Sequence, residues 1–220
     1  MRILLVASLL AVPFFANAQD HNTYGLTDSQ IAEMGETRWD QFYAGKAGES
    51  TAAMVEMNDI YGEALRRRND LLEASAKQEV KARVDKLRAL LVDIGGTACD
   101  IGYNIDGGGT IWSPVTAHVE ATTEQVLYEM LGGRAMPATH LTTSAVEKQL
   151  DVLAKKIAKT HADKDAAAYF KYEAAKASLD KMRTDFAEIK NVAKALDRPK
   201  SDRVLGCCKD YAKMALGDWS

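Results

Sequence analysis

Glycines and oxygen-bearing side chains alternate over residues 102–107, in the order Gly102-x-Asn104-x-Asp106-Gly107. Alternating oxygen ligands around a glycine are typical of a calcium-binding loop, in which the ligands surround the ion and the glycine permits a tight turn. The pattern is incomplete, because Gly102 occupies the first ligand position and Ser113 the twelfth, where carboxylates are needed. We therefore predict a structural or partner-binding loop here, and no metal site.

Side chains that could act as nucleophiles, bases or metal ligands show no diagnostic spacing. The histidines form no His-x-x-x-His pair of the kind that binds zinc on a helix; they are His21, His118, His140 and His161. No nucleophile elbow is present, and residues 107–109 lack the preceding strand and the following Lys-Ser/Thr pair of a phosphate-binding loop. We therefore predict a protein that is not an enzyme and that has no cofactor.

Three cysteines, Cys99, Cys207 and Cys208, are the remaining candidates for covalent chemistry. The spacing Cys-x-x-Cys of redox-active pairs is absent, which favours a structural role. In an oxidising compartment three cysteines give one disulfide and one thiol. We predict a Cys99–Cys208 disulfide, because Cys208 falls on an apolar helix face; its long loop would stabilise the fold by about 4 to 5 kcal/mol. A vicinal bridge, an intermolecular bridge and three free thiols are the alternatives.

Two aromatic residues, Tyr103 and Trp112, lie in or beside the glycine-rich stretch. Aromatic anchors on loops are typical of recognition surfaces. We predict that these two residues bind a partner, together with Asn104 and, from a second irregular stretch at 134–143, Arg134. The alternative is that the aromatic rings fold back onto the helices.

The first eighteen residues predict the compartment. Arg2 precedes an apolar run from Ile3 to Phe15, and Ala16-Asn17-Ala18 places small residues at the two cleavage positions of a secretory signal. The run is shorter than the about 20 residues of a membrane-spanning helix, and no cysteine follows it that could carry a lipid. We predict cleavage after Ala18 and a soluble periplasmic or secreted protein without membrane insertion.

Charge argues against a nucleic-acid partner. Signal removal takes one arginine from the 28 basic residues and none from the 31 acidic ones, so the mature chain carries 27 against 31 and a net charge of −4. Binding to nucleic acid depends on a basic surface that displaces counterions from phosphates. The only basic cluster, Arg66-Arg67-Arg68, is diluted by Glu63, Asp70 and Glu73, which indicates a solvated helix face.

Helices must position all of these residues. A capping box at Thr27 and Gln30 opens a first helix that ends at 45–48. Apolar residues then recur at helical spacing from 51 to 94, as one very long helix or two without a strong break, ending at Gly95-Gly96. Residues 97–113 carry four glycines and read as a loop. Ser113-Pro114 opens the next helix, which ends at Gly132-Gly133.

The C-terminal third predicts a helical hairpin and a final helix. Ser144 and Glu147 form a capping box before a stripe of Val146, Leu150, Leu153 and Ile157. The second arm begins at Asp163 and carries the clearest stripe, made of Tyr169, Tyr172, Ala175, Leu179, Met182, Phe186, Ile189, Ala193 and Leu196. Ser201 caps a last helix whose face is Val204, Cys208, Tyr211 and Ala215.

No segment shows sustained alternation of period two, so the predicted class is all-α. The predicted architecture is a helical bundle with a long antiparallel helical hairpin and a Gly-rich loop. We expect a signal peptide at 1–18, an N-terminal helical region at 19–139, and a C-terminal hairpin plus final helix at 140–220. The last two regions are expected to pack as one domain.

Five stretches between residues 51 and 131 form a recognisable pattern: EMND at 56–59, the following YGEALRRRNDLL, the segment ending at Cys99, GGGTIWSP at 107–114 and ATTEQVLYEML at 121–131. On these stretches the chain resembles the lysozyme inhibitor LprI-like family of exported bacterial proteins. Ile60 stands where the family has a cysteine, and His118 stands near the place of a later one, so the family's disulfides do not carry over. The resemblance implies a non-catalytic binder that protects the cell wall from lysozyme.

We therefore expect an exported soluble helical binding protein whose partner is a protein, with a lysozyme or another cell-wall hydrolase as the specific expectation. A glycosidase inhibitor must occlude a cleft that holds two carboxylates, and a projecting loop with an aromatic side chain suits that task. The alternative is a periplasmic coiled-coil scaffold or chaperone-like protein that uses residues 144–196 for homo-oligomer formation or for client binding.

Overall fold

The computed structural model of the 220-residue chain describes residues 51–106, 109, 111–133, 140–160 and 166–217. These residues form helices without strands, which confirms the predicted all-α class. The helices are α3 (Thr51–Ala74), α4 (Gln78–Asp106), α5 (Trp112–Met130), α6 (Thr143–Thr160), α7 (Ala166–Ala193) and α8 (Arg198–Met214). The predicted signal peptide, the predicted helix after Thr27, and Arg134 lie outside the described residues.

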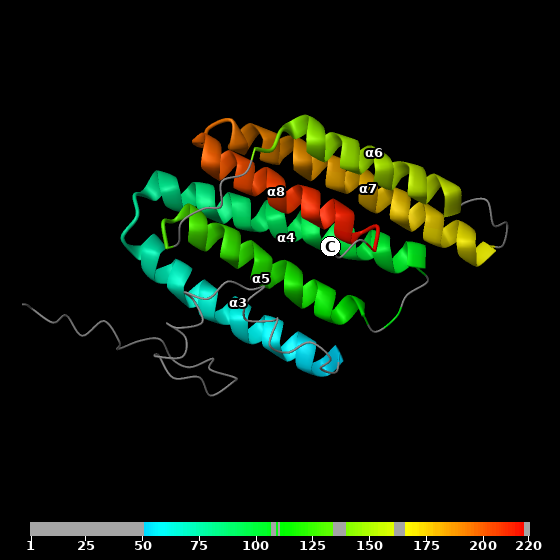
Figure 1. Cartoon of the computed structure of the whole chain (residues 1–220), viewed down its shortest axis with the longest axis horizontal. Helices are drawn as coiled ribbons and strands as arrows, with labels where there is room; N and C mark the ends of the chain where they lie inside the picture. The colour runs from blue at the N-terminus through cyan, green and yellow to red at the C-terminus, as the bar shows by residue number, and fades with distance from the viewer. Residues whose placement is uncertain (1–50, 107–108, 110, 134–139, 161–165, 218–220) are drawn as a thin grey trace, which may run out of the picture.

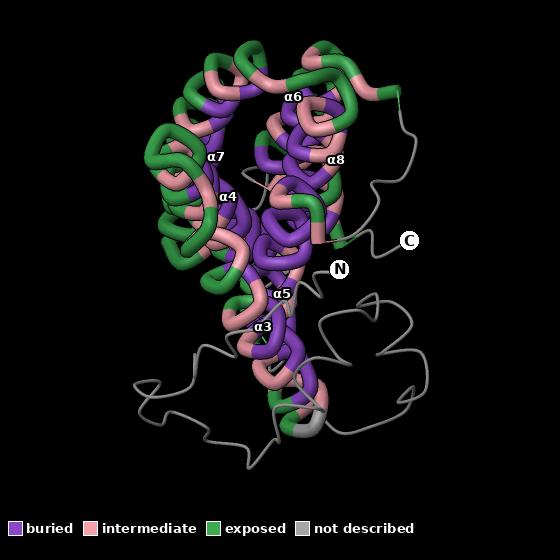
Figure 2. Tube along the Cα trace, turned by 90° about the vertical axis from the view of Figure 1, so that its left-hand side faces the viewer, coloured by how far each residue is buried: buried purple, intermediate pink, exposed green. Residues whose placement is uncertain are grey.

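The helices lie side by side with roughly parallel axes (Figure 1). Helix α5 lies between α3 on one side and α4 and α8 on the other, while α6 and α7 cover the opposite side of α4 and α8 (Figures 1 and 2). Helix α3 packs almost entirely on α5, at the narrow edge of the molecule (Figure 2). One cluster of buried apolar side chains runs through α4 to α8, and a smaller one joins α3 to α5.

The predicted helical stretch from 51 to 94 is divided by a short turn at residues 75–77. Ser75 Oγ donates a hydrogen bond to the Leu72 carbonyl, and the Ala76 N–H donates to the Glu73 carbonyl at 3.0 Å, which closes the last turn of α3. Helix α4 then runs back antiparallel to α3 (Figure 1). Of the two forms predicted for this stretch, the structure therefore has two helices.

The predicted end of a helix at Gly95-Gly96 is wrong, because α4 continues through both residues to Asp106. A Cβ atom on Gly95 would lie 2.1 Å from Cγ1 of Val119 in α5, so the missing side chain lets the two helices approach closely. Residues 97–106, predicted to be a loop, consequently form the last turns of α4.

The predicted start of the next helix is shifted as well. Ile111 stands at the N-cap of α5, so Ser113 is not the cap. Pro114 lies in the first turn, where backbone N–H groups have no acceptor within the helix, so its missing N–H costs no hydrogen bond. The predicted end is confirmed: α5 stops at Met130, and Gly132 has a φ of +88°, in the left-handed region that favours glycine.

The predicted hairpin is present as α6 and α7, and the apolar stripe of α6 is buried as predicted. In α7 the buried stripe starts only at Ala175, because Tyr169 is 49% exposed and Tyr172 is partly exposed. The most extensive contact of α7 is with α4 rather than with α6. The hairpin is therefore an integral part of the bundle.

The last helix begins earlier than predicted. Asp197 rather than Ser201 caps α8, since its side chain accepts a hydrogen bond from the Lys200 N–H at 3.1 Å, and Pro199 lies in the first turn. The predicted inward face is confirmed, because Val204, Cys208, Tyr211 and Ala215 are buried.

The predicted Cys99–Cys208 disulfide is absent: all three cysteines are buried free thiols. Cys99 hydrogen-bonds Thr116, whereas Tyr211, three residues beyond Cys208, bonds Thr123. Thr116 and Thr123 are seven residues apart on α5, about 10 Å along a helix. Helix α8 runs antiparallel to α5 (Figure 1), so Cys208 lies farther still from the level of Thr116 than Tyr211 does. A disulfide needs Cα atoms at most about 6.8 Å apart, so Cys99 and Cys208 are too far apart to form one.

Candidate interaction surface

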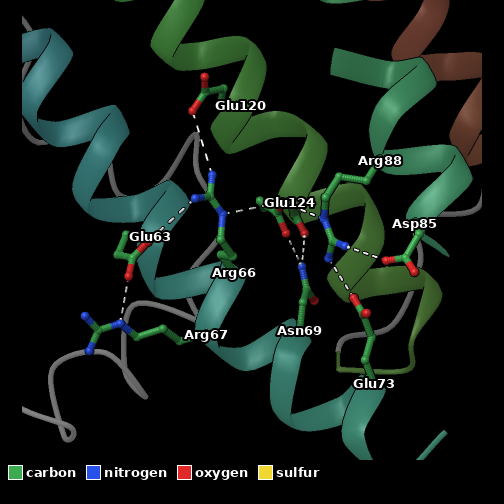
Figure 3. A network of polar contacts seen from close by, with 9 residues as sticks. All are labelled: Glu63, Arg66, Arg67, Asn69, Glu73, Asp85, Arg88, Glu120 and Glu124. Atoms are coloured by element: carbon green, nitrogen blue, oxygen red, sulfur yellow. Dashed lines mark hydrogen bonds and ion pairs between the residues drawn. The ribbon is translucent and has the colours of Figure 1, made fainter. Parts of the chain in front are cut away.

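Helix α5 carries several buried polar residues, and the carboxylate of Glu124 contacts side chains from two other helices. Its side chain is 3% exposed and accepts hydrogen bonds from Arg88 Nε at 2.9 Å and from Asn69 Nδ2 at 2.8 Å. Arg66 Nε lies 3.9 Å from the same carboxylate. Helices α3, α4 and α5 therefore meet at one carboxylate (Figure 3).

Arg88 extends this network outward. It donates to Glu73 Oε1 at 2.6 Å and to Asp85 Oδ1 at 3.3 Å. Burial disfavours its charged form, but the carboxylates of Glu124 and Glu73 outweigh burial and raise the pKa of Arg88. Nearby, burial raises the pKa of Asp70 above its usual range. Asn69 Oδ1 is buried without a hydrogen-bond partner.

A second polar cluster connects α5 to α8. Arg203 donates from Nε to the buried carboxylate of Glu129, which also accepts from Gln125 Nε2 at 3.3 Å. Tyr211 Oη donates to the Val119 carbonyl at 2.9 Å and lies 2.9 Å from Thr123 Oγ1. Burial raises the pKa values of Cys99 and Cys207 to about 11, so these thiols stay protonated at neutral pH.

Both clusters connect helices through pairs of opposite charge. Each carboxylate at their centres, Glu124 and Glu129, is held by an arginine. Within the described ranges, no three His, Cys, Asp or Glu side chains converge as metal ligands would. Paired buried charges of this kind fix the relative positions of elements, so we assign these clusters a structural role.

The predicted partner-binding residues have different positions in the structure. Tyr103 is 50% exposed, as its predicted role in binding requires, but it lies on α4 and not on a loop. Asn104 lies next to it, and its amide donates to the Asp100 carbonyl at 2.8 Å. Trp112 is only 6% exposed and its ring packs over Gly102, so the prediction of a projecting anchor is wrong for Trp112. The ring folds back, which was the alternative.

Ion pairs and packing contacts place further apolar residues at the level of Tyr103. Between antiparallel α4 and α7, Lys181 pairs with Asp93 and Lys86 with Glu188. Continuing this register by helical rise places Phe170 at about the level of Asn104 along the bundle. The packing of Trp112 on Gly102 likewise places Ile111 near Tyr103.

Four of the seven exposed large apolar residues in the described chain therefore gather at one end of the bundle. We call this set the aromatic end: Tyr103, Ile111, Tyr169 and Phe170, with exposures of 50%, 45%, 49% and 72%. The rings of Tyr169 and Phe170 meet edge to face, with centroids 6.2 Å apart.

Sequence reasoning missed three members of the aromatic end. Tyr169 was placed on the core stripe, and Ile111 and Phe170 were not selected. One signal was available for Phe170: adjacent residues point about 100° apart on a helix, so Phe170 falls to one side of the predicted stripe that contains Tyr169.

No described helix has the length and apolar character needed to cross a bilayer. Comparison of the chain with protein-family models, with curated proteins and with solved structures found no match. The functional argument therefore rests on the surface itself.

Proposed function

We propose that the protein is an exported, non-enzymatic binding protein that engages a protein partner through the aromatic end. The supporting observation is the gathering of Tyr103, Ile111, Tyr169 and Phe170 at one end of the bundle. Exposed aromatic residues dominate the binding energy of many protein interfaces. An exposed apolar cluster without such a role is an aggregation liability.

The support beneath the aromatic end favours binding without large rearrangement. Tyr103 stands on the last turns of α4, which are backed by the buried ring of Trp112. Phe170 lies near the start of α7, a helix that packs against α4. Side chains on helices lose less conformational entropy on binding than side chains on mobile loops.

For the partner, we propose a cell-wall hydrolase such as lysozyme. This narrower proposal rests on the family resemblance of residues 51–131 and on residue type, because exposed aromatic side chains at one end of the bundle suit a concave substrate cleft. Tyr103 and Asn104 fall within the region of resemblance, whereas Phe170 does not.

A lysis assay tests the narrower proposal. The mature protein should slow lysis of bacterial cell walls by lysozyme, and the double variant Tyr103→Ala/Phe170→Ala should inhibit at least about tenfold less. Leu71→Ala is the matched control, because Leu71 is 54% exposed but lies on α3 away from this end. Undiminished lysis at a molar excess of protein would exclude lysozyme as the partner.

Affinity capture tests the broader proposal independently. Immobilised wild-type protein and the Leu71→Ala control should retain the same envelope protein, and the double variant should not. Equal retention by all three proteins would show that the aromatic end does not bind the partner.

A further inference from the structure

Helix α7 carries an outward stripe with a regular charge pattern. Its residues follow one another at intervals of four and three, all are exposed, and they are Tyr169, Glu173, Lys176, Asp180, Arg183 and Ala187. This spacing keeps side chains on one face over several turns and is the spacing of helix-to-helix contacts in coiled coils. We call this set the α7 stripe.

A pocket of about 180 Å³ lies at one end of the α7 stripe, in the groove between α6 and α7. Its floor is apolar, formed by Leu150, Phe186 and Ala187. Ion pairs cross the groove on both sides, from Lys190 to Glu147 at 2.6 Å and from Arg183 to Asp151 at 3.0 Å.

The size and lining of this pocket fit one aromatic ring. An apolar cavity of about 150 Å³ holds benzene, so the pocket is large enough for a phenol ring but small for an independent ligand. Apolar pockets with a polar rim are the usual receptors for aromatic anchors at protein interfaces.

The charge order of the α7 stripe is complementary to itself when two copies run antiparallel. With Tyr169 opposite Ala187 of a second copy, Glu173 falls opposite Arg183. In the same register Lys176 falls opposite Asp180, and the two-fold axis repeats each pair. A parallel arrangement in register would instead place identical charges opposite each other, which disfavours it.

We infer that two copies of this chain associate through the α7 stripe, with Tyr169 of each copy inserted into the α6–α7 pocket of the other. The rings contribute most of the affinity, whereas the exposed ion pairs mainly select the register. Arg183 can take part because a guanidinium has five N–H donors and the contact with Asp151 uses only one nitrogen.

The register is set by Tyr169. A shift by seven residues in either direction would place Tyr169 opposite Asp180 or Lys194, away from the pocket floor. Phe170 lies on the other edge of α7, at helical spacing from Lys181 and Glu188, which pair with α4. Tyr103 and Phe170 therefore stay accessible in the dimer, and the inference does not depend on the proposed function.

Charge reversal at Lys176 and Asp180 tests the inference. The wild-type protein and its variants, each beginning at residue 19, are compared by sedimentation equilibrium up to millimolar concentration. Lys176→Glu and Asp180→Lys should each raise the dissociation constant of the dimer at least about tenfold, because each creates two like-charge contacts. The double variant K176E/D180K should restore dimerisation, which neither shifted register predicts.

Two further variants complete the test. Tyr169→Ala should weaken the dimer at least about tenfold, and Lys77→Glu, an exposed reversal in the turn before α4, should leave it unchanged. All substituted positions are exposed, so helicity by circular dichroism should stay at the wild-type level. A monomer at every concentration would overturn the dimer, and single reversals without effect would overturn this register.

Discussion

Gly95 and Gly96 are neighbours in the sequence but differ in what surrounds them. A Cβ on Gly95 would collide with Val119, whereas a Cβ on Gly96 would meet no atom within 4 Å. Gly95→Ala should therefore destabilise the protein by about 1 to 3 kcal/mol through overpacking. Gly96→Ala should stabilise it by up to about 1 kcal/mol through helix propensity.

Urea unfolding of the two variants measures this difference. A Gly95→Ala variant as stable as Gly96→Ala would show that α4 and α5 are farther apart than the structure has them.

The three cysteines should be unreactive in the folded protein. Each thiol is buried, and burial raises the pKa of Cys99 and of Cys207 to about 11. A thiol reagent at mildly alkaline pH should label no cysteine in the native protein and all three after unfolding in denaturant. A single labelled cysteine in the denatured, unreduced protein would indicate a disulfide and contradict the structure.

His118 should make stability depend on pH. His118 is largely buried in the bundle, and this burial lowers its pKa to about 4. The pKa of His118 in the unfolded chain is about 6.5. At pH values between about 6.5 and 4 the unfolded chain therefore binds more protons than the folded protein, so the free energy of unfolding should fall as the pH decreases.

Replacing His118 with glutamine should flatten this dependence. Between about pH 7 and pH 4.5, His118→Gln should lose roughly 2 kcal/mol less stability than the wild type. Denaturant unfolding at several pH values measures the slopes, and parallel slopes would show that His118 is protonated equally in both states.

At the scale of the elements, Glu124 should decide how firmly α3 is attached. Glu124→Ala leaves Arg88 and Asn69 without their shared buried acceptor, so we expect a loss of about 3 kcal/mol of unfolding free energy. Glu63→Ala, which removes the more exposed pair with Arg67, should cost less than about 1 kcal/mol.

Hydrogen exchange localises the effect of Glu124→Ala. Amides of α3 should exchange faster in this variant, while amides of α6 and α7 keep their protection, because α3 packs almost entirely on α5. Uniform acceleration in all helices would show that α3 does not open separately.

The elements that the sequence predicted best are the one-sided helices. In α6 the residues Val146, Leu150, Leu153 and Ile157 are buried as predicted, since a helix with one solvated face carries a clear stripe. The C-terminal half of α5 has no solvated face of that kind, since residues 123–130 are all buried, Glu124 and Glu129 included. Burial of a charged side chain depends on a partner from another helix, which local periodicity cannot reveal.

Glycines account for the main error in the predicted elements and for part of the error in the candidate site. Glycine-rich sequence between 95 and 109 favours a loop when only local preferences are considered. In the structure Gly95 and Gly102 instead face Val119 and the ring of Trp112. Tyr103 was predicted correctly as exposed, whereas the position of Trp112 depends on a neighbouring helix.

For the whole molecule, the inferred dimer has a geometric consequence for partner binding. Because the two α7 helices would run antiparallel, the two aromatic ends would point in opposite directions. Tyr169 would be buried in the dimer, but each end would still offer Tyr103 and Phe170. One dimer could then bind two separate partner molecules, one at each end, whereas two ends that point apart could not engage one flat surface together.

The hydrogen bond between Tyr211 and Thr123 spans 88 residues of sequence. Helix α5 is synthesised before α8, so the Thr123 hydroxyl and the Val119 carbonyl gain Tyr211 as a partner only when the last helix of the chain docks. Because α8 also contacts α4, α6 and α7, the native packing of the bundle can be completed only after the final helix has been made.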